Sequence, residues 1–139
     1  LEGQLKKAAA DRLDKDVFFL PFQNQASMPD IYAMLDFIVL PSAHSETWGL
    51  CINEAMNCAV VPIVSDVVGC GPDLVSPGQT GWVFKHADVG SLRSAILSAA
   101  QLPDEERLRM ATACQQKIER YSVENASDAL LRAVTSLAA

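Results

Sequence analysis

Two acidic residues, Glu46 and Glu54, have the type and spacing best suited to binding chemistry in this sequence. They lie on either side of Gly49, and the apolar spacing over 50–58 predicts a helix. The apolar residues of that helix share one buried face, so Glu54 points the opposite way, toward a volume that Glu46 also faces. Carboxylates accept hydrogen bonds from the paired hydroxyls of ribose and hexose rings, which indicates a sugar-bearing ligand. For Glu54 the alternative is a surface acid stabilised by the positive end of the helix.

The start of the helix predicted over 50–58 is a second candidate feature. A polar loop over 41–49 ends in Gly49 and leads directly into this helix. A helix start preceded by glycine presents unpaired backbone N–H groups and a partial positive charge, which suits a phosphate. The alternative is that Gly49 only caps the helix, a position that glycine accepts.

Strand and helix patterns alternate along the chain and predict how these residues are positioned. Short apolar runs, each bounded by Pro, Gly or Asp, alternate with stretches whose apolar residues have helical spacing. Such alternation produces right-handed βαβ units, so we predict an α/β fold, a Rossmann-like three-layer parallel sheet with helices on both faces. The predicted strands are 17–20, 37–40, 60–65 and 82–84, and the predicted helices are 5–13, 28–35, 50–58 and 89–100, the last capped by Asp88.

Two further amphipathic helices are predicted at the end of the chain. The first opens at Pro103 with acids in its first turn, and the second is capped by Ser122. Their apolar stripes predict packing against the rest of the domain. The stripes are Leu108, Ala111, Cys114 and Ile118 in the first helix, and Val123, Ala126, Leu130, Val134 and Leu137 in the second.

Length and composition narrow the class of protein. The chain has 139 residues, a net charge of −6 and 50% hydrophobic residues, which suits one globular domain with its own core. The acidic balance argues against a nucleic-acid partner, which requires clustered positive charge. No apolar run approaches the ~18 residues that a membrane span needs.

The cysteines and histidines form no disulfide or metal pattern. No C-x-x-C pair occurs, so we interpret the four cysteines as small buried hydrophobes of a cytoplasmic protein, and two histidines do not predict a zinc site. These residues are Cys51, Cys58, Cys70, Cys114, His44 and His86.

The segment around the two glutamates resembles a known family signature. After the strand predicted over 37–40, residues 45–56 read Ser-Glu-Thr-Trp-Gly-Leu-Cys-Ile-Asn-Glu-Ala-Met. This segment resembles the E-x7-E signature of glycosyltransferase family 4 (group 1), retaining sugar-nucleotide transferases of the two-domain GT-B architecture. The later stretches Asp-Leu-Val at 73–75 and Gly-Gln-Thr-Gly at 78–81 also resemble that family. The sequence departs from the family pattern at Pro21, Ala59 and Cys70, where glycine is usual, and these changes affect loop geometry.

The resemblance implies a role for each matched residue. Glu46 would be the catalytic residue and contact hydroxyls of the donor sugar, and Glu54 would hold the ribose diol of the nucleotide. Backbone N–H groups at the start of the helix would meet the diphosphate or sugar of a UDP-sugar or GDP-sugar, with no metal and no further cofactor. The implied donor-binding set is Glu46, Thr47, Trp48, Gly49, Leu50, Cys51 and Glu54.

The distribution of charge bears on whether this chain could work alone. Residues 16–84 contain seven acids and no Lys or Arg, so the whole net charge lies around the candidate site. A nucleotide diphosphate is itself an anion, and a helix start supplies only about half a unit of positive charge. The resemblance implies that an Arg/Lys pair precedes this segment, together with an N-terminal acceptor domain. We therefore predict that residues 1–139 are most of a GT-B C-terminal donor-binding domain, inactive alone, of a transferase used for example in polysaccharide biosynthesis.

Other interpretations stay open at this point. The chain could belong to a GT-B relative of another reaction type, a sugar-nucleotide epimerase or phosphorylase, or be a non-catalytic α/β interaction module. We expect self-association through an open sheet edge near 17–20. For location we expect the cytoplasm, with peripheral membrane association of a full-length parent as the alternative.

Overall fold

The protein is built around a parallel sheet of three strands. The computed structural model describes residues 1–43 and 46–137, and its strands are β1 (Phe37–Leu40), β2 (Val61–Ser65) and β3 (Trp82–Phe84). The sheet order is β1-β2-β3, with Phe37 opposite Val61 and Ile63 opposite Trp82. Every residue of β2 is buried, as expected for a central parallel strand covered on both faces.

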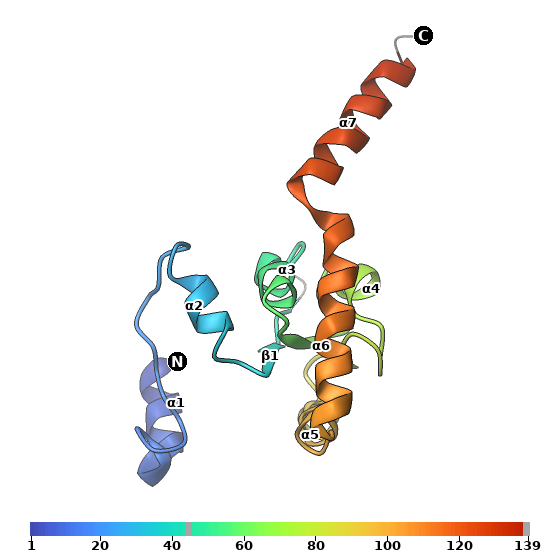
Figure 1. Ribbon diagram of the computed structural model, residues 1–139. Coiled ribbons are helices and arrows are strands. Elements are labelled where there is room, and N and C mark those ends of the chain that lie inside the picture. Colours follow the sequence, from blue (N-terminus) through green and yellow to red (C-terminus); the bar gives the residue numbers. More distant parts are fainter. Residues whose placement is uncertain (44–45, 138–139) are drawn as a thin grey trace.

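Helices cover both faces of this sheet, which confirms the predicted three-layer α/β fold (Figure 1). On one face Ile63 and Phe84 pack with Ala95 and Ala99 of α5 (Val89–Ala100). Val64 belongs to the larger core cluster on the other face, because neighbouring strand residues point to opposite sides. That cluster includes residues from α3 (Leu50–Asn57), α4 (Gly71–Leu74) and α6 (Asp104–Ile118).

Local signals in the sequence locate most of these elements well. The strand predicted over 60–65 begins one residue later, and the helix predicted over 89–100 has those same ends. Asp88 caps that helix as predicted, with its carboxylate accepting a hydrogen bond from the N–H of Ser91 at 2.9 Å. Ser122 likewise accepts one from the N–H of Asn125 at 3.2 Å. Both caps supply an acceptor for an N–H group that has no partner inside its helix.

The strand predicted over 17–20 is wrong. Val17 forms an isolated bridge with Leu13, and the N–H groups of Asp16 and Val17 donate to the carbonyl of Arg12 instead of joining a ladder. These bonds close a tight turn after α1 (Glu2–Ala9) and the short 3-10 helix at Ala10–Arg12. Residues beyond the turn run extended beside α1 and away from the sheet, so the unpaired sheet edge beyond β1 belongs to β1 itself.

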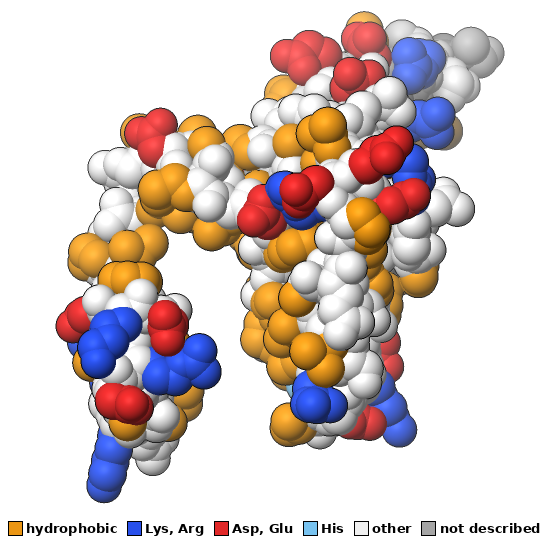
Figure 2. Space-filling view, turned by 60° about the horizontal axis from the view of Figure 1, so that its bottom comes forward, with side chains coloured by type: hydrophobic (Ala, Val, Ile, Leu, Met, Phe, Trp, Pro, Cys, Tyr) orange, Lys and Arg blue, Asp and Glu red, His pale blue; other side chains and the backbone are white. Residues whose placement is uncertain are grey.

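The two ends of the chain stand apart from the core. Figure 2 shows the N-terminal segment as a separate lobe bearing acidic and basic side chains. A narrow stretch leads from it to α2 (Met28–Tyr32), which is shorter than the helix predicted over 28–35. At the other end α7 (Val123–Leu137) follows a 3-10 turn at Glu119–Tyr121 and points away from the sheet (Figure 1). No described helix is long and apolar enough to cross a membrane.

The predicted packing of the last two helices needs correction. In α6, Ala111, Cys114 and Ile118 are buried as predicted, but Leu108 is exposed and Met110 takes its place in the core. At 3.6 residues per turn, Leu108 lies on the flank of the stripe while Met110 lies nearer its centre. The predicted stripe of α7 does not pack, since no described residue of this helix is buried. An amphipathic pattern shows that a face can be buried but does not identify what covers it.

One substitution tests the backbone strain that follows α3. Ala59 adopts a left-handed conformation with φ 64° between α3 and β2. Glycine reaches this region without the clash of a side chain, so Ala59→Gly should raise the free energy of unfolding by about 1 kcal/mol in urea denaturation. The matched control is Ala129→Gly at an exposed position inside α7 (Val123–Leu137), which should lower it by up to about 1 kcal/mol. Equal destabilisation by both changes would contradict the strain at Ala59.

Candidate functional site

The loops that follow β1 and β2 lie against each other and fix the start of α3. The N–H of Cys70 donates to the carbonyl of Trp48 at 2.8 Å. Gly69 packs so closely that a Cβ added there would lie 2.0 Å from the carbonyl oxygen of Thr47. We call this contact between residues 47–49 and 69–70 the loop clasp. It holds together the two loops at the carboxyl ends of neighbouring strands, where ligands bind in open α/β sheets.

Gly49 completes the loop clasp and turns the chain into α3. It is buried with φ 97°, a left-handed conformation that favours glycine. A side chain there would press against Leu40 and Val68, at 3.1 and 3.3 Å. No side chain of the described residues caps α3, which begins directly at the exposed Leu50. The first turn therefore keeps the backbone N–H donors and partial positive charge predicted from the sequence.

Glu46 is held at the tip of the loop after β1. Its side chain is half-buried, its N–H donates to the carbonyl of Ala43 at 3.1 Å, and its Oε2 lies 3.5 Å from the hydroxyl of Ser42. The hydroxyl of the fully buried Ser65, at the end of β2, donates to the carbonyl of Ser42 at 2.6 Å. Ser65 therefore connects the central strand to the loop that carries Glu46.

Glu54 lies one turn into α3 and is also half-buried. The phenol of Tyr32, at the end of α2, donates to Glu54 Oε2 at 3.0 Å. As predicted, the helix residues Ile52, Ala55 and Met56 face the core, so Glu54 lies on the flank of α3 that is turned toward α2. Glu54 is thus a partnered side chain rather than a free surface acid.

The Cys51 thiol lies within electrostatic reach of both carboxylates. Burial is the main reason that the pKa of Cys51 is raised, and the negative charges of Glu46 and Glu54 raise it further. Glu46 and Glu54 therefore both lie within electrostatic reach of one group in the first turn of α3. The deeper thiols behave as buried hydrophobes, since burial raises the pKa of Cys70 to about 11 and that of Cys114 to about 12.

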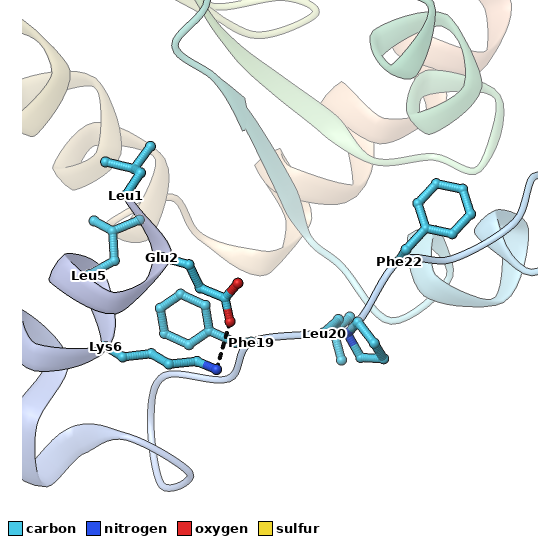
Figure 3. Close-up of a pocket in the computed structure, with 8 residues that line it drawn as sticks. Leu1, Glu2, Leu5, Lys6, Phe19, Leu20 and Phe22 are labelled. Carbon is cyan, nitrogen blue, oxygen red and sulfur yellow. Dashed lines mark ion pairs between the residues drawn. The ribbon is translucent and has the colours of Figure 1, made fainter.

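Two cavities of the structure differ in their relation to the candidate site. A cavity of about 210 Å³ lies between α2 and α3 and is lined in part by Tyr32 and Glu54. A larger one of about 510 Å³ lies between α1 and the extended segment after it, lined by Leu5, Lys6 and Phe19 among others (Figure 3). Its charged groups already pair with each other, Lys6 Nζ with Glu2 Oε1 at 2.7 Å, and it lies far from the carboxyl ends of the strands. The smaller cavity is lined by Glu54, and Glu46 is not among the residues that line it.

The structure assigns different parts to the predicted donor-binding residues. Thr47 and Leu50 are exposed, Gly49 is buried, and Trp48 contributes its carbonyl to the loop clasp while its ring stacks near Tyr121, with centroids 6.0 Å apart. The motif residue Ser45 and the histidine His44 lie outside the described residues. Sequence reasoning missed Tyr32 and Ser65. A tyrosine in an apolar segment was the available signal, because a buried phenol needs a hydrogen-bond partner.

The loop clasp predicts a sharp difference between two neighbouring glycines. Gly69→Ala places a methyl group into the Thr47 carbonyl and should lower the free energy of unfolding by about 2 kcal/mol. At Gly71 an added methyl meets nothing closer than Val64, at 3.8 Å, so Gly71→Ala should stay within about 0.5 kcal/mol of the original chain. Denaturant unfolding measures both variants, and equal stabilities would show that the clasp does not hold the loops.

Comparison with curated proteins finds clear relatives of the chain. It is 32% identical over 131 residues to D-inositol 3-phosphate glycosyltransferase from Mycobacterium tuberculosis and Mycobacterium bovis, an alignment that covers 94% of this chain and 27% of the relative. The chain therefore spans about a quarter of the length of these relatives.

Solved structures share the fold. Sucrose-phosphate synthase from Thermosynechococcus elongatus superposes with a TM-score of 0.79 at 21% identity, covering 98% of this chain and 34% of that one. Anabaena HepE in complex with UDP-glucose gives 0.78 at 20% identity, covering 97% and 36%. The C-terminal domain of a group 1 glycosyl transferase, LpcC from Francisella tularensis, gives 0.69 at 24% identity, covering 88% and 60%.

A family model confirms the resemblance drawn from the two glutamates and their flanks. The model described as glycosyl transferases group 1 matches residues 2–117, most of the chain. This protein belongs to the group 1 glycosyltransferases.

Proposed function

We propose that this chain is the donor-binding domain of a retaining, metal-independent glycosyltransferase that moves a sugar from a nucleotide-sugar to an acceptor. The observation that carries the proposal is the pair of half-buried acids, Glu46 just before α3 and Glu54 one turn into it. They lie beside a helix start whose first N–H groups have no side-chain cap among the described residues. This arrangement can bind hydroxyl pairs and a diphosphate side by side.

Each part of the site has a proposed task. Glu54 accepts hydrogen bonds from the ribose diol, and Glu46, the proposed catalytic residue, contacts hydroxyls of the donor sugar. The N–H groups at the start of α3, around Leu50 and Cys51, meet the diphosphate. Stabilising the departing diphosphate is the main contribution that a protein makes to such a transfer. We take UDP-glucose as the first donor to test, because Anabaena HepE was solved in complex with it.

The acidic character of the chain supports a division of labour with another domain. Residues 16–84 contain no Lys or Arg, so the cations that balance a diphosphate must come from elsewhere. We propose that they, and an N-terminal acceptor domain, belong to the length of the relatives that this chain does not span. The isolated chain should then bind UDP weakly and transfer no sugar. Its four free cysteines favour the cytoplasm as its location.

The two acids should respond differently to the same substitution. Glu54→Gln should weaken binding of both UDP and UDP-glucose by about tenfold, because it removes a charged acceptor from the ribose. Glu46→Gln should weaken the binding of UDP-glucose by a similar factor and leave the affinity for UDP unchanged, because UDP has no donor sugar for Glu46 to contact. Ligand-observed NMR titration can measure dissociation constants in the weak range expected for the chain.

An exposed acid on α6 provides the matched control for these titrations. Glu105→Gln makes the same chemical change away from the candidate site and should leave both affinities at the original values. If Glu54→Gln and Glu46→Gln also leave them unchanged, the chain is not a donor-binding domain of the proposed kind and the interaction module is favoured.

We also propose that the chain self-associates through the exposed apolar side chains of the extended segment beside α1. Phe18, Leu20 and Phe22 are 64%, 62% and 95% exposed. A group of exposed apolar side chains favours association between chains. Light scattering should therefore find a dimer or larger species, and Phe22→Asp should shift it toward the monomer. A monodisperse monomer at all concentrations would overturn this proposal.

A further inference from the structure

Tyr32 is the side chain that fixes the position of Glu54. It ends α2, is 3% exposed, and packs in a small core cluster with Ala55 and Val60. This packing holds the ring, and its hydroxyl donates to Glu54 Oε2 at 3.0 Å. The partner of Glu54 is therefore a rigid group from a different element, 22 residues away along the chain.

In the hydrogen bond between Tyr32 and Glu54, the phenol is the donor and the carboxylate is the acceptor. Burial, followed by the hydrogen bond to Glu54 and its negative charge, raises the pKa of Tyr32, so the phenol stays protonated at neutral pH and acts as a donor. The bond occupies one lone pair of Oε2 and leaves the second oxygen, Oε1, available. A carboxylate needs both an available oxygen and a fixed direction to accept bonds from two neighbouring hydroxyls.

A glutamate side chain that is already held in its binding rotamer gives a higher affinity. An unfixed side chain loses rotamer freedom when a ligand binds, and that loss weakens the affinity. Glu54 is half-buried and lines the cavity between α2 and α3 together with Tyr32. A phenylalanine at position 32 would fill the same space in the core but would release the carboxylate.

We propose that Tyr32 is a positioning residue of the donor site: it holds the Glu54 carboxylate in the rotamer that accepts the ribose diol, with Oε1 directed to the ligand. The proposal rests on the ribose-binding role proposed for Glu54. Because Tyr32 is only 3% exposed, we expect it to act on binding through Glu54, so that its effect is confined to ligands that carry the diol.

The test compares UDP with 2′,3′-dideoxy-UDP, which lacks both ribose hydroxyls. The original chain should bind UDP about tenfold more tightly than the dideoxy analogue in NMR titration. Tyr32→Phe should weaken the binding of UDP by about threefold to fivefold and leave the affinity for the analogue unchanged. The matched control is Tyr121→Phe, which alters the only other tyrosine and should change neither affinity. In a chain already carrying Glu54→Gln, Tyr32→Phe should have no further effect on UDP.

The possible failures separate this inference from the proposed function. If the original chain does not distinguish UDP from the analogue, or binds neither, the ribose role of Glu54 fails and the inference fails with it. If it distinguishes them and Tyr32→Phe distinguishes them equally well, Glu54 binds ribose without help from Tyr32. Equal weakening of both ligands by Tyr32→Phe, with cooperative unfolding retained, would show a general structural role and overturn positioning.

Discussion

The site depends on one backbone contact, the loop clasp between residues 47–49 and 69–70. The hydrogen bond from the Cys70 N–H to the Trp48 carbonyl joins the loops that leave β1 and β2. Because Gly69 has no side chain, the carbonyl of Thr47 can approach its backbone, and Gly49 can then turn the chain sharply into α3. The direction of α3 decides where Glu54 points, and the loop before it decides where Glu46 lies. The loop clasp therefore helps to position both acids.

The second physical feature is an electrostatic imbalance around this contact. Residues 16–84 contain two half-buried carboxylate acceptors near the start of α3 and no Lys or Arg, and the charges of these acids add to the effect of burial in raising the pKa of Cys51. The positive end of one short helix provides only partial compensation. In the two-domain enzyme that we propose, the other domain would supply the missing cations. The chain spans about a quarter of the length of its curated relatives.

The sequence predicted the features that depend on local patterns. Strands at 37–40 and 82–84, the cap at Asp88 and the core-facing side of α3 follow from periodicity and capping, and the structure has all of them. The hydrogen bonds of Tyr32 and Ser65 were not predicted, because their partners lie 22 and 23 residues away along the chain and no spacing rule connects such residues. The strand predicted over 17–20 failed for a related reason. An apolar run becomes a strand only when a neighbour accepts its backbone bonds, and these bonds go to a local turn instead.

The central claim is that a nucleotide-sugar binds across Glu46, the first turn of α3 and Glu54. Backbone amide NMR of the chain, titrated with UDP-glucose, tests it most directly. The account predicts concentration-dependent shifts at Thr47–Ile52 and around Tyr32 and Glu54, with little change in α1 or α6. Shifts confined to the cavity beside α1, or no shifts at millimolar ligand, would contradict it.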